Sequence, residues 1–126
     1  MSIFTHIAVG TNDLGKARAF YDKVLGALGI KRMFDGENAS FWGSETGTIM
    51  VTRPIDGKAA TRANGGTVGL AASTRAAVDA FHREALANGG TCDGAPGPRQ
   101  HLPNAYGAYI RDPDGNKFCA YCYAEE

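Results

Sequence analysis

Two side chains of this 126-residue chain are of types that could do chemistry together, His6 and Cys119. A cysteine thiol with a lowered pKa is a nucleophile, and a histidine within hydrogen-bond reach can act as its base. His6 falls in the first strand that the sequence predicts and Cys119 in the last. The two residues are therefore the candidate catalytic pair, and the alternative is that Cys119 only lines a pocket.

Strand alternation assigns further residues to the same sheet face as this pair. Successive side chains of a strand point to opposite faces. In the first predicted strand Ile7 and Val9 are the apolar set, so His6 faces the other way. The same argument, applied to the other strands, puts Met50, Thr67, Cys119 and Tyr121 on this side as well. This is the face of the sheet that the helices leave open. We expect this open face to be exposed to solvent or to form the wall of a cavity that binds a small molecule.

Cys119 and Cys122 have the CxxC spacing of redox and zinc motifs, but strand geometry excludes that interpretation. An odd separation along a strand puts the two sulfurs on opposite faces. Cys122 is expected in the core with Phe118 and Ala120. With Cys92 the chain has three cysteines, an odd number that cannot form a closed set of disulfides. Reduced thiols and a cytoplasmic location are therefore expected.

A proline-rich loop over residues 95–103 carries further candidates for substrate binding. Arg99 could hold an anionic ligand bidentately, and His101 lies close to it in the sequence. Loops at a pocket mouth often carry binding groups. Trp42 and Tyr106 offer aromatic surface for the same purpose. The alternatives are a solvated loop and aromatic side chains that belong to the core.

The apolar spacing predicts helices over residues 14–28 and 75–88, each followed by glycine. Strands are predicted over residues 3–10, 30–34, 39–43, 48–54, 67–72, 91–92, 106–111 and 117–123. Adding 61 to a residue number takes Phe20 to Phe81 and Gly29 to Gly90, which indicates an internal duplication. We therefore expect one α+β domain over residues 1–126. Its two tandem βαβββ modules, 1–54 and 67–126, are joined by a connector, 55–66, and form a curved, mostly antiparallel mixed sheet around a pocket.

Composition and charge exclude several classes of partner. Thirteen basic and thirteen acidic residues give a formal net charge of zero, so no basic footprint for a nucleic acid is expected. No apolar run approaches the ~18 residues of a membrane span. The first residues have neither the cationic region nor the apolar region of a secretory signal.

Several runs of the sequence resemble one known superfamily. Residues 6–9 (HIAV), 13–14 (DL), 19–21 (AFY) and 24–26 (VLG) resemble the opening of the vicinal oxygen chelate proteins. This group includes glyoxalase I, bleomycin-resistance proteins and type I extradiol dioxygenases. Residues 109–117 (YIRDPDGNK) look like its closing hairpin. The resemblance covers almost the whole chain and is specific for the fold rather than for the reaction.

The resemblance implies a metal centre in catalytic members, with ligands from the first, fourth, fifth and eighth strands. These ligands are usually His or Gln, Glu, His and Glu, and the matching positions here hold His6, Met50, Thr67 and Cys119. Only His6 is retained, whereas a catalytic site wants about three protein ligands. No cofactor is therefore expected, with a divalent Zn, Ni, Mn or Fe ion as the alternative. A His/Met/Cys set would favour a soft ion such as Cu(I).

Three functions follow as hypotheses. The first is a small-molecule binding protein of bleomycin-resistance type whose metal ligands are mostly lost. The second is a metal-dependent lyase or dioxygenase that uses His6 with non-standard ligands. The third is a metal-free enzyme that uses Cys119 and His6. The resemblance also implies a homodimer, because these proteins often complete their pockets across paired subunits.

Overall fold

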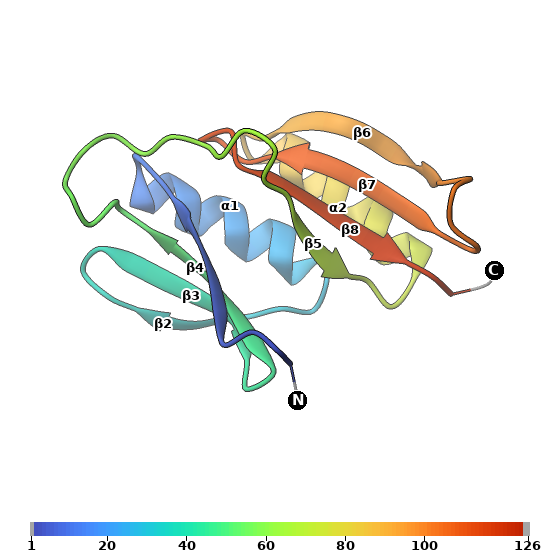
Figure 1. Ribbon diagram of the computed structural model, residues 1–126, viewed down its shortest axis with the longest axis horizontal. Coiled ribbons are helices and arrows are strands. Elements are labelled where there is room, and N and C mark those ends of the chain that lie inside the picture. The colour runs from blue at the N-terminus through green and yellow to red at the C-terminus, as the bar shows by residue number, and fades with distance from the viewer. Residues whose placement is uncertain (1, 125–126) are drawn as a thin grey trace.

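The computed structural model describes residues 2–124, and its elements follow the predicted order (Figure 1). In chain order they are β1 (His6–Gly10), α1 (Leu14–Gly26), β2 (Arg32–Asp35), β3 (Ala39–Ser44), β4 (Gly47–Thr52), β5 (Val68–Ala71), α2 (Arg75–Ala87), β6 (Thr91–Pro98), β7 (Tyr106–Arg111) and β8 (Lys117–Cys122). Each half of the chain is one strand, one helix and three strands.

The eight strands form two four-stranded sheets, with strand orders β1-β4-β3-β2 and β5-β8-β7-β6. In each sheet one pair is parallel, β1 with β4 and β5 with β8, and the other pairs are antiparallel. Figure 1 shows both helices behind the sheets, and α1 contacts α2. The α+β class with mostly antiparallel mixed pairing is confirmed, and the expected curved sheet is built as two sheets.

Both helices begin at side-chain caps. The Asp13 carboxylate accepts a hydrogen bond from the backbone N–H of Lys16 at 3.0 Å, and the Thr74 hydroxyl accepts one from Ala77 at 3.0 Å. These caps satisfy amide groups that have no partner inside the helix. Gly29 follows α1 with a φ of +79°, a left-handed conformation that suits glycine.

One hydrophobic core lies between the helices and the sheets and draws on both halves of the chain. Strand alternation predicts its members correctly. Ile49 and Val51 of β4 and the set Phe118, Ala120 and Cys122 of β8 all belong to it. Cys119 and Cys122 therefore lie on opposite faces of β8, as their spacing predicts.

The strand near Cys92 is longer than predicted, and the difference has a structural reason. The prediction ends it at residue 92 and assigns 95–103 to a loop, whereas β6 runs to Pro98. β6 is the edge strand of its sheet. The prolines at positions 96 and 98 lack a backbone N–H, and an edge strand tolerates this because its outer side pairs with no other strand. Its register with β7 shifts twice, between Cys92 and Gly94 and between Gly94 and Gly97.

A buried carboxylate in the β7–β8 turn ties the second half of the chain to α1. The Tyr21 hydroxyl donates to Asp112 Oδ2 at 2.5 Å, and the Asn116 side-chain amide donates to the same oxygen at 2.9 Å. The backbone N–H groups of Asp114 and Asn116 donate to Asp112 Oδ1 at 3.0 and 2.8 Å. Burial is the main cause that raises the pKa of Asp112, although these bonds act in the opposite direction.

The same turn also holds the end of β1. Asp114 accepts a hydrogen bond from the Thr11 hydroxyl at 2.6 Å and one from the Asn12 backbone N–H at 2.9 Å. Asn116 donates its side-chain amide to the Gly10 carbonyl at 2.9 Å. We call the bonds of Asp112, Asp114 and Asn116 to residues 10–12 and Tyr21 the inter-module clasp.

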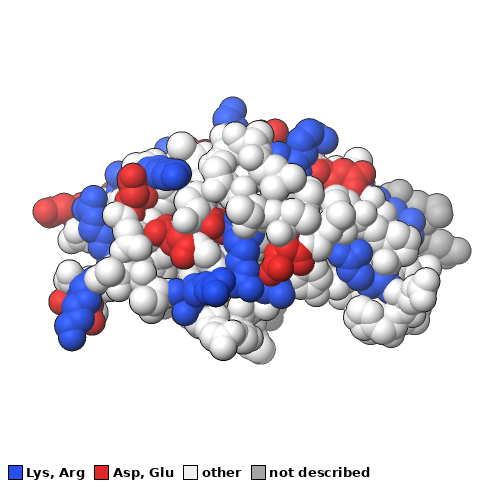
Figure 2. Space-filling model, turned by 90° about the horizontal axis from the view of Figure 1, so that it is seen from above, with Lys and Arg blue, Asp and Glu red and all other residues white. Residues whose placement is uncertain are grey.

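Charged side chains of both signs are interspersed on the face that Figure 2 shows. This mixture agrees with the formal net charge of zero. Among the described residues neither helix has the length and apolar character needed to cross a membrane.

Candidate functional site

The residues that alternation assigns to the open face lie on the side of the sheets away from the helices. Cys119 is buried there, Met50 and Tyr121 are half-buried, and His6 and Thr67 are exposed. Thr67 sits one position before β5. The arrangement is a shallow surface in a single chain rather than an enclosed cavity.

His6 is held by its neighbour in the sequence. Its ring atom Nδ1 lies 3.0 Å from the Thr5 hydroxyl oxygen. In the parallel pairing of β1 with β4, His6 lies opposite Thr48, and Met50 lies opposite Ala8. Met50 is thus two positions further along the sheet than the imidazole.

The donor atoms on this face do not suit the metal centre that the resemblance implies. Thr67 lines a crevice between β1 and β5 together with Ala8 and Lys117, and its neutral hydroxyl is a poor metal ligand. Within residues 2–124 no group of three or more His, Cys, Asp or Glu side chains could hold a metal ion. Since a divalent ion in a catalytic site wants about three protein ligands, the four positions do not fit it.

The surroundings of Cys119 oppose the role of nucleophile. Its thiol is 5% exposed, and burial raises its pKa, while a hydrogen bond with Tyr109 and the charge of Lys117 act in the opposite direction. A raised pKa leaves the thiol protonated at neutral pH, and the thiolate is the reactive form. The structure gives the candidate pair no shared hydrogen bond among the described residues.

Thiol labelling is expected to detect Cys92 and to miss Cys119. Cys92 is exposed, whereas Cys119 and Cys122 are buried. With 5,5′-dithiobis(2-nitrobenzoate) at pH 8 we expect one fast equivalent per chain and two that react roughly 100-fold more slowly, because they need local opening. The Cys92→Ser variant should lose the fast phase and Cys119→Ser should keep it. A fast phase that disappears in Cys119→Ser would restore Cys119 as a candidate nucleophile.

Three tyrosines form a cluster on the open face of the second sheet, which we call the tyrosine cluster: Tyr109, Tyr121 and Tyr123. The hydroxyls of Tyr109 and Tyr121 lie 2.8 Å apart, and this bond is the main cause that raises the pKa of Tyr109. The rings of Tyr121 and Tyr123 stack with an interplanar angle of 11°. A Cβ atom at Gly107 would lie 2.7 Å from the Tyr121 ring, so glycine is needed for this ring to lie against the sheet.

Cationic side chains border the tyrosine cluster. Lys117 Nζ lies 5.1 Å and Arg99 Cζ 5.8 Å from the centroid of the Tyr109 ring, both within cation–π range. Asp93 accepts ion pairs from Lys117 at 3.3 Å and from Arg111 at 3.1 Å. The cations therefore already have aromatic or acidic partners.

The two candidates from the proline-rich segment, Arg99 and His101, differ in how firmly the structure holds them. Two donors of the Arg99 guanidinium bind carbonyl groups of β6, those of Gly97 at 2.9 Å and Ala95 at 3.0 Å. Arg99 is thus fixed beside the tyrosine cluster, with fewer donors left for the bidentate anion contact that the sequence suggests. His101 is exposed in the β6–β7 loop.

Trp42 and Tyr106 lie on the helix side and not on the open face, so the structure does not bring them together with the other residues predicted to bind a substrate. Trp42 is 0% exposed, and its Nε1 donates to Asp22 of α1 at 3.0 Å. Tyr106 packs against the core, and its hydroxyl donates to Asp79 of α2 at 2.6 Å. Both aromatic rings are needed to join helix to sheet, so they are not free to take a ligand on the open face.

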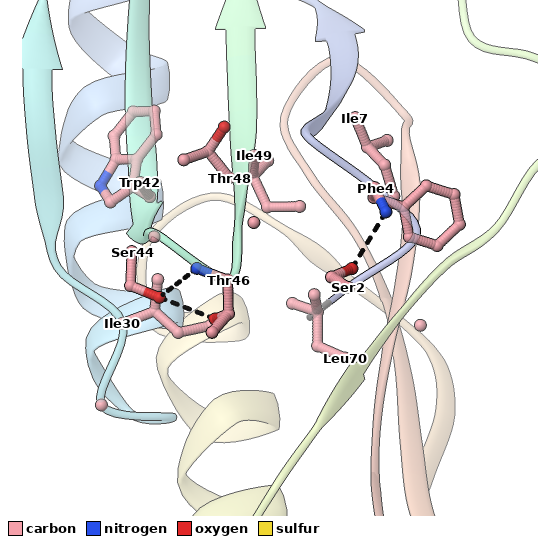
Figure 3. A pocket seen from close by; sticks show the side chains of 14 residues that line it. Ser2, Phe4, Ile7, Ile30, Trp42, Ser44, Thr46, Thr48, Ile49 and Leu70 are labelled. Carbon is pink, nitrogen blue, oxygen red and sulfur yellow. Dashed lines mark hydrogen bonds between the residues drawn. The ribbon is translucent and has the colours of Figure 1, made fainter.

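Sequence reasoning missed a pocket on the helix side, at the ends of the strands. Its volume is about 310 Å³ and its walls come from both modules, including Ile7, Ile49 and Leu70 (Figure 3). Alternation places these side chains in the core, and no local signal in the sequence shows that the core is incompletely filled there.

Comparisons with known proteins agree with this fold. A family model described as "Glyoxalase/Bleomycin resistance protein/Dioxygenase superfamily" matches residues 3–120. The crystal structure of a glyoxalase/bleomycin resistance protein from Albidiferax ferrireducens T118 is similar, with 47% identity, a TM-score of 0.89, and coverage of 96% of this chain and 98% of that one. No individually curated protein matches the chain.

Two more distant structures show the fold alone. Lactoylglutathione lyase from Agrobacterium tumefaciens is 21% identical, with a TM-score of 0.67, over 96% of this chain and 93% of that one. TioX from Micromonospora sp. ML1 is 15% identical, with a TM-score of 0.69, over 96% of this chain and 98% of that one. The same architecture thus occurs in proteins with different names.

Proposed function

The chain belongs to the glyoxalase/bleomycin resistance protein/dioxygenase superfamily, and on that premise we propose that it binds a small organic molecule on its open face without a family-type metal. The observation that carries the proposal is the set of side chains at the four ligand positions. His6 is a good ligand, whereas Met50, Thr67 and Cys119 are a thioether, a hydroxyl and a buried protonated thiol.

The tyrosine cluster is the most ordered part of the proposed site. Tyr121 contacts Tyr109 edge-on at 5.8 Å between ring centroids and stacks on Tyr123. Gly69 and Ala71 lie beside Tyr121 and Tyr123 in a shallow pocket of about 250 Å³. Aromatic surface with one or two hydroxyls suits a ligand that is mainly apolar and has a polar group.

A second copy of the chain is part of the proposal, because the open face is shallow in one chain. On β2 the side chains of Met33 and Phe34 are 54% and 60% exposed, and Phe34 contacts Phe41 of β3. Exposed apolar side chains of this kind mark surfaces that associate. A homodimer would cover them and deepen the site.

A cytoplasmic location, suggested by three free cysteines, belongs to the same proposal.

Elemental analysis with a ligand screen tests the proposal. After incubation with Zn, Ni, Mn and Fe(II), we expect far less than one metal ion per chain, and the same low content in His6→Ala. One ion per chain that is lost in His6→Ala would overturn the metal-free proposal and support a metal-dependent lyase or dioxygenase.

The ligand screen uses thermal shifts and a matched pair of variants. Tyr121→Phe and Tyr106→Phe each remove one phenolic hydroxyl. Tyr121 lies on the open face of the second sheet, and Tyr106 lies on its helix side. For compounds that stabilise the protein we expect Tyr121→Phe to weaken binding about tenfold, the worth of one hydrogen bond, and Tyr106→Phe to leave it unchanged. Equal effects of both variants would place the ligand elsewhere.

A further inference from the structure

The pocket on the helix side lies where the two modules meet. Ile7 of β1 and Ile49 of β4 come from the first module, and Leu70 of β5 comes from the second. Figure 3 shows these side chains with Trp42 around one hollow, and the Ser44–Thr46 turn at its rim. Ile7, Ile49 and Leu70 belong to or pack against the core. The pocket reaches the edge of the sheets, because Thr48 and Gly69 also line it, and it shares Gly69 and Leu70 with the shallow pocket beside the tyrosine cluster. The inference concerns the part of the pocket on the helix side and does not rest on the proposed function.

The chemistry of the walls is uniform, because none of the 14 lining residues carries a charge. Six of the lining residues are aliphatic or aromatic, four are glycine, and four carry a hydroxyl, namely Ser2, Ser44, Thr46 and Thr48. The hydroxyl oxygens of Ser44 and Thr46 are 2.8 Å apart, and Thr48 donates weakly to the Thr5 carbonyl at 3.4 Å. A charged group placed here would lose water without gaining a counter-ion, at a large cost.

The pocket is an open depression rather than a void inside the core, because Phe4, Ser44 and Thr46 on its lining are exposed. A volume of about 310 Å³ lies at the lower end of the range of known ligand pockets. The apolar lining that is still accessible is Phe4, at 54% exposed, with the half-buried Ile7, Ile30 and Leu70, whereas Ile49 and Trp42 are 6% and 0% exposed. An apolar guest that covers such a wall is stabilised by the hydrophobic effect.

We propose that this inter-module pocket is a binding site for a small, uncharged, mainly apolar molecule that has one hydrogen-bonding group. Its apolar part contacts Ile7, Ile30 and Leu70, and its polar group faces the hydroxyls of Ser44 and Thr46. Because the guest touches both modules, binding stabilises their association.

The single tryptophan of the chain gives a direct test, since Trp42 forms one wall of the pocket. The probe is 4-bromobenzyl alcohol, which is neutral and has a bromine atom that quenches tryptophan fluorescence at short range. Its matched counterpart is 4-bromobenzoate, which has a similar size and a negative charge. We expect saturable quenching by the alcohol, with an apparent affinity at least tenfold higher than that of the benzoate.

Four variants locate the quenching. Thr46→Phe closes the rim and Ile30→Phe fills the interior, and each is expected to weaken quenching at least tenfold. Thr61→Phe, at an exposed position of the connector, and Tyr121→Phe, on the open face, are expected to leave it unchanged. Ile30→Phe is the alternative variant if Thr46→Phe fails to fold.

Four results would overturn the inference. The first is linear, non-saturating quenching by the alcohol, and the second is equal affinity for the alcohol and the benzoate. The third is quenching that disappears as protein concentration rises, because a second copy of the chain would then be the occupant. Loss of quenching in Tyr121→Phe alone would assign the probe to the open face and also overturn it.

Discussion

Replacing Asp112 by alanine is expected to lower the free energy of unfolding by about 3 to 4 kcal/mol. The Asp112 carboxylate is 3% exposed and accepts four hydrogen bonds, from Tyr21, the Asn116 side chain and two backbone amides. Alanine leaves all four donors without their acceptor, and buried donors without partners are costly. Urea unfolding followed by circular dichroism measures the loss.

Two further variants check the cause of this loss. Tyr21→Phe removes one of the four donors and should cost about 1.5 to 3 kcal/mol, the usual worth of a hydrogen bond to a charged group. Asp56→Ala removes an exposed carboxylate of the connector and should change stability by less than about 0.5 kcal/mol. An Asp112→Ala loss no larger than that of Asp56→Ala would show that the inter-module clasp contributes nothing to stability.

The pH dependence of the Asp112 contribution has a definite sign. Burial raises the pKa of Asp112 above its usual value of 3.8 in the folded protein. A raised folded pKa means that the contribution is complete below 3.8 and declines as the pH rises through the folded pKa. The stability difference between the natural protein and Asp112→Ala should therefore be larger at pH 4 than at pH 7. A difference that grows towards pH 7 would contradict this assignment.

Trp42→Ala is expected to cost about 3 to 5 kcal/mol of stability, because it leaves a large cavity in the core. The Trp42 ring is 0% exposed and contacts Tyr21 at 5.4 Å between ring centroids. The substitution also removes the hydrogen bond from Nε1 to Asp22. Guanidinium unfolding followed by far-ultraviolet circular dichroism measures the change.

Phe41→Ala is the matched control, since Phe41 precedes Trp42 on β3 and points to the open face. It is half-buried and should cost less than half as much. Equal losses for the two substitutions would show that Trp42 is not a core residue.

Much of the fold could be predicted because its elements repeat a clear periodicity. The apolar spacing of α1, with Tyr21 and Leu25, and the alternation of β8, with Phe118 and Ala120, bury the expected faces. β6 could not be predicted in full, since glycine and proline dominate its sequence. An edge strand tolerates these residues because half of its backbone groups need no partner in the sheet.

The site could be predicted less well, for two physical reasons. Alternation requires apolar residues on one face only, and in β3 the adjacent Phe41 and Trp42 are both aromatic, so the sequence does not say which ring is in the core. Packing between Trp42 and α1 decides it. The inter-module pocket depends on how closely two modules approach each other, which no local pattern in the sequence encodes.

The inter-module clasp also affects the order of events during synthesis. Thr11 and Asp114 are 103 positions apart, and Asn116 reaches back 106 positions to Gly10. Closing so long a loop is slow compared with forming a helix. During synthesis, Tyr21 of α1 cannot form its hydrogen bond to Asp112 until almost the whole remaining sequence has been made. The nascent first half is therefore the species most exposed to aggregation, and the one for which a chaperone would matter most.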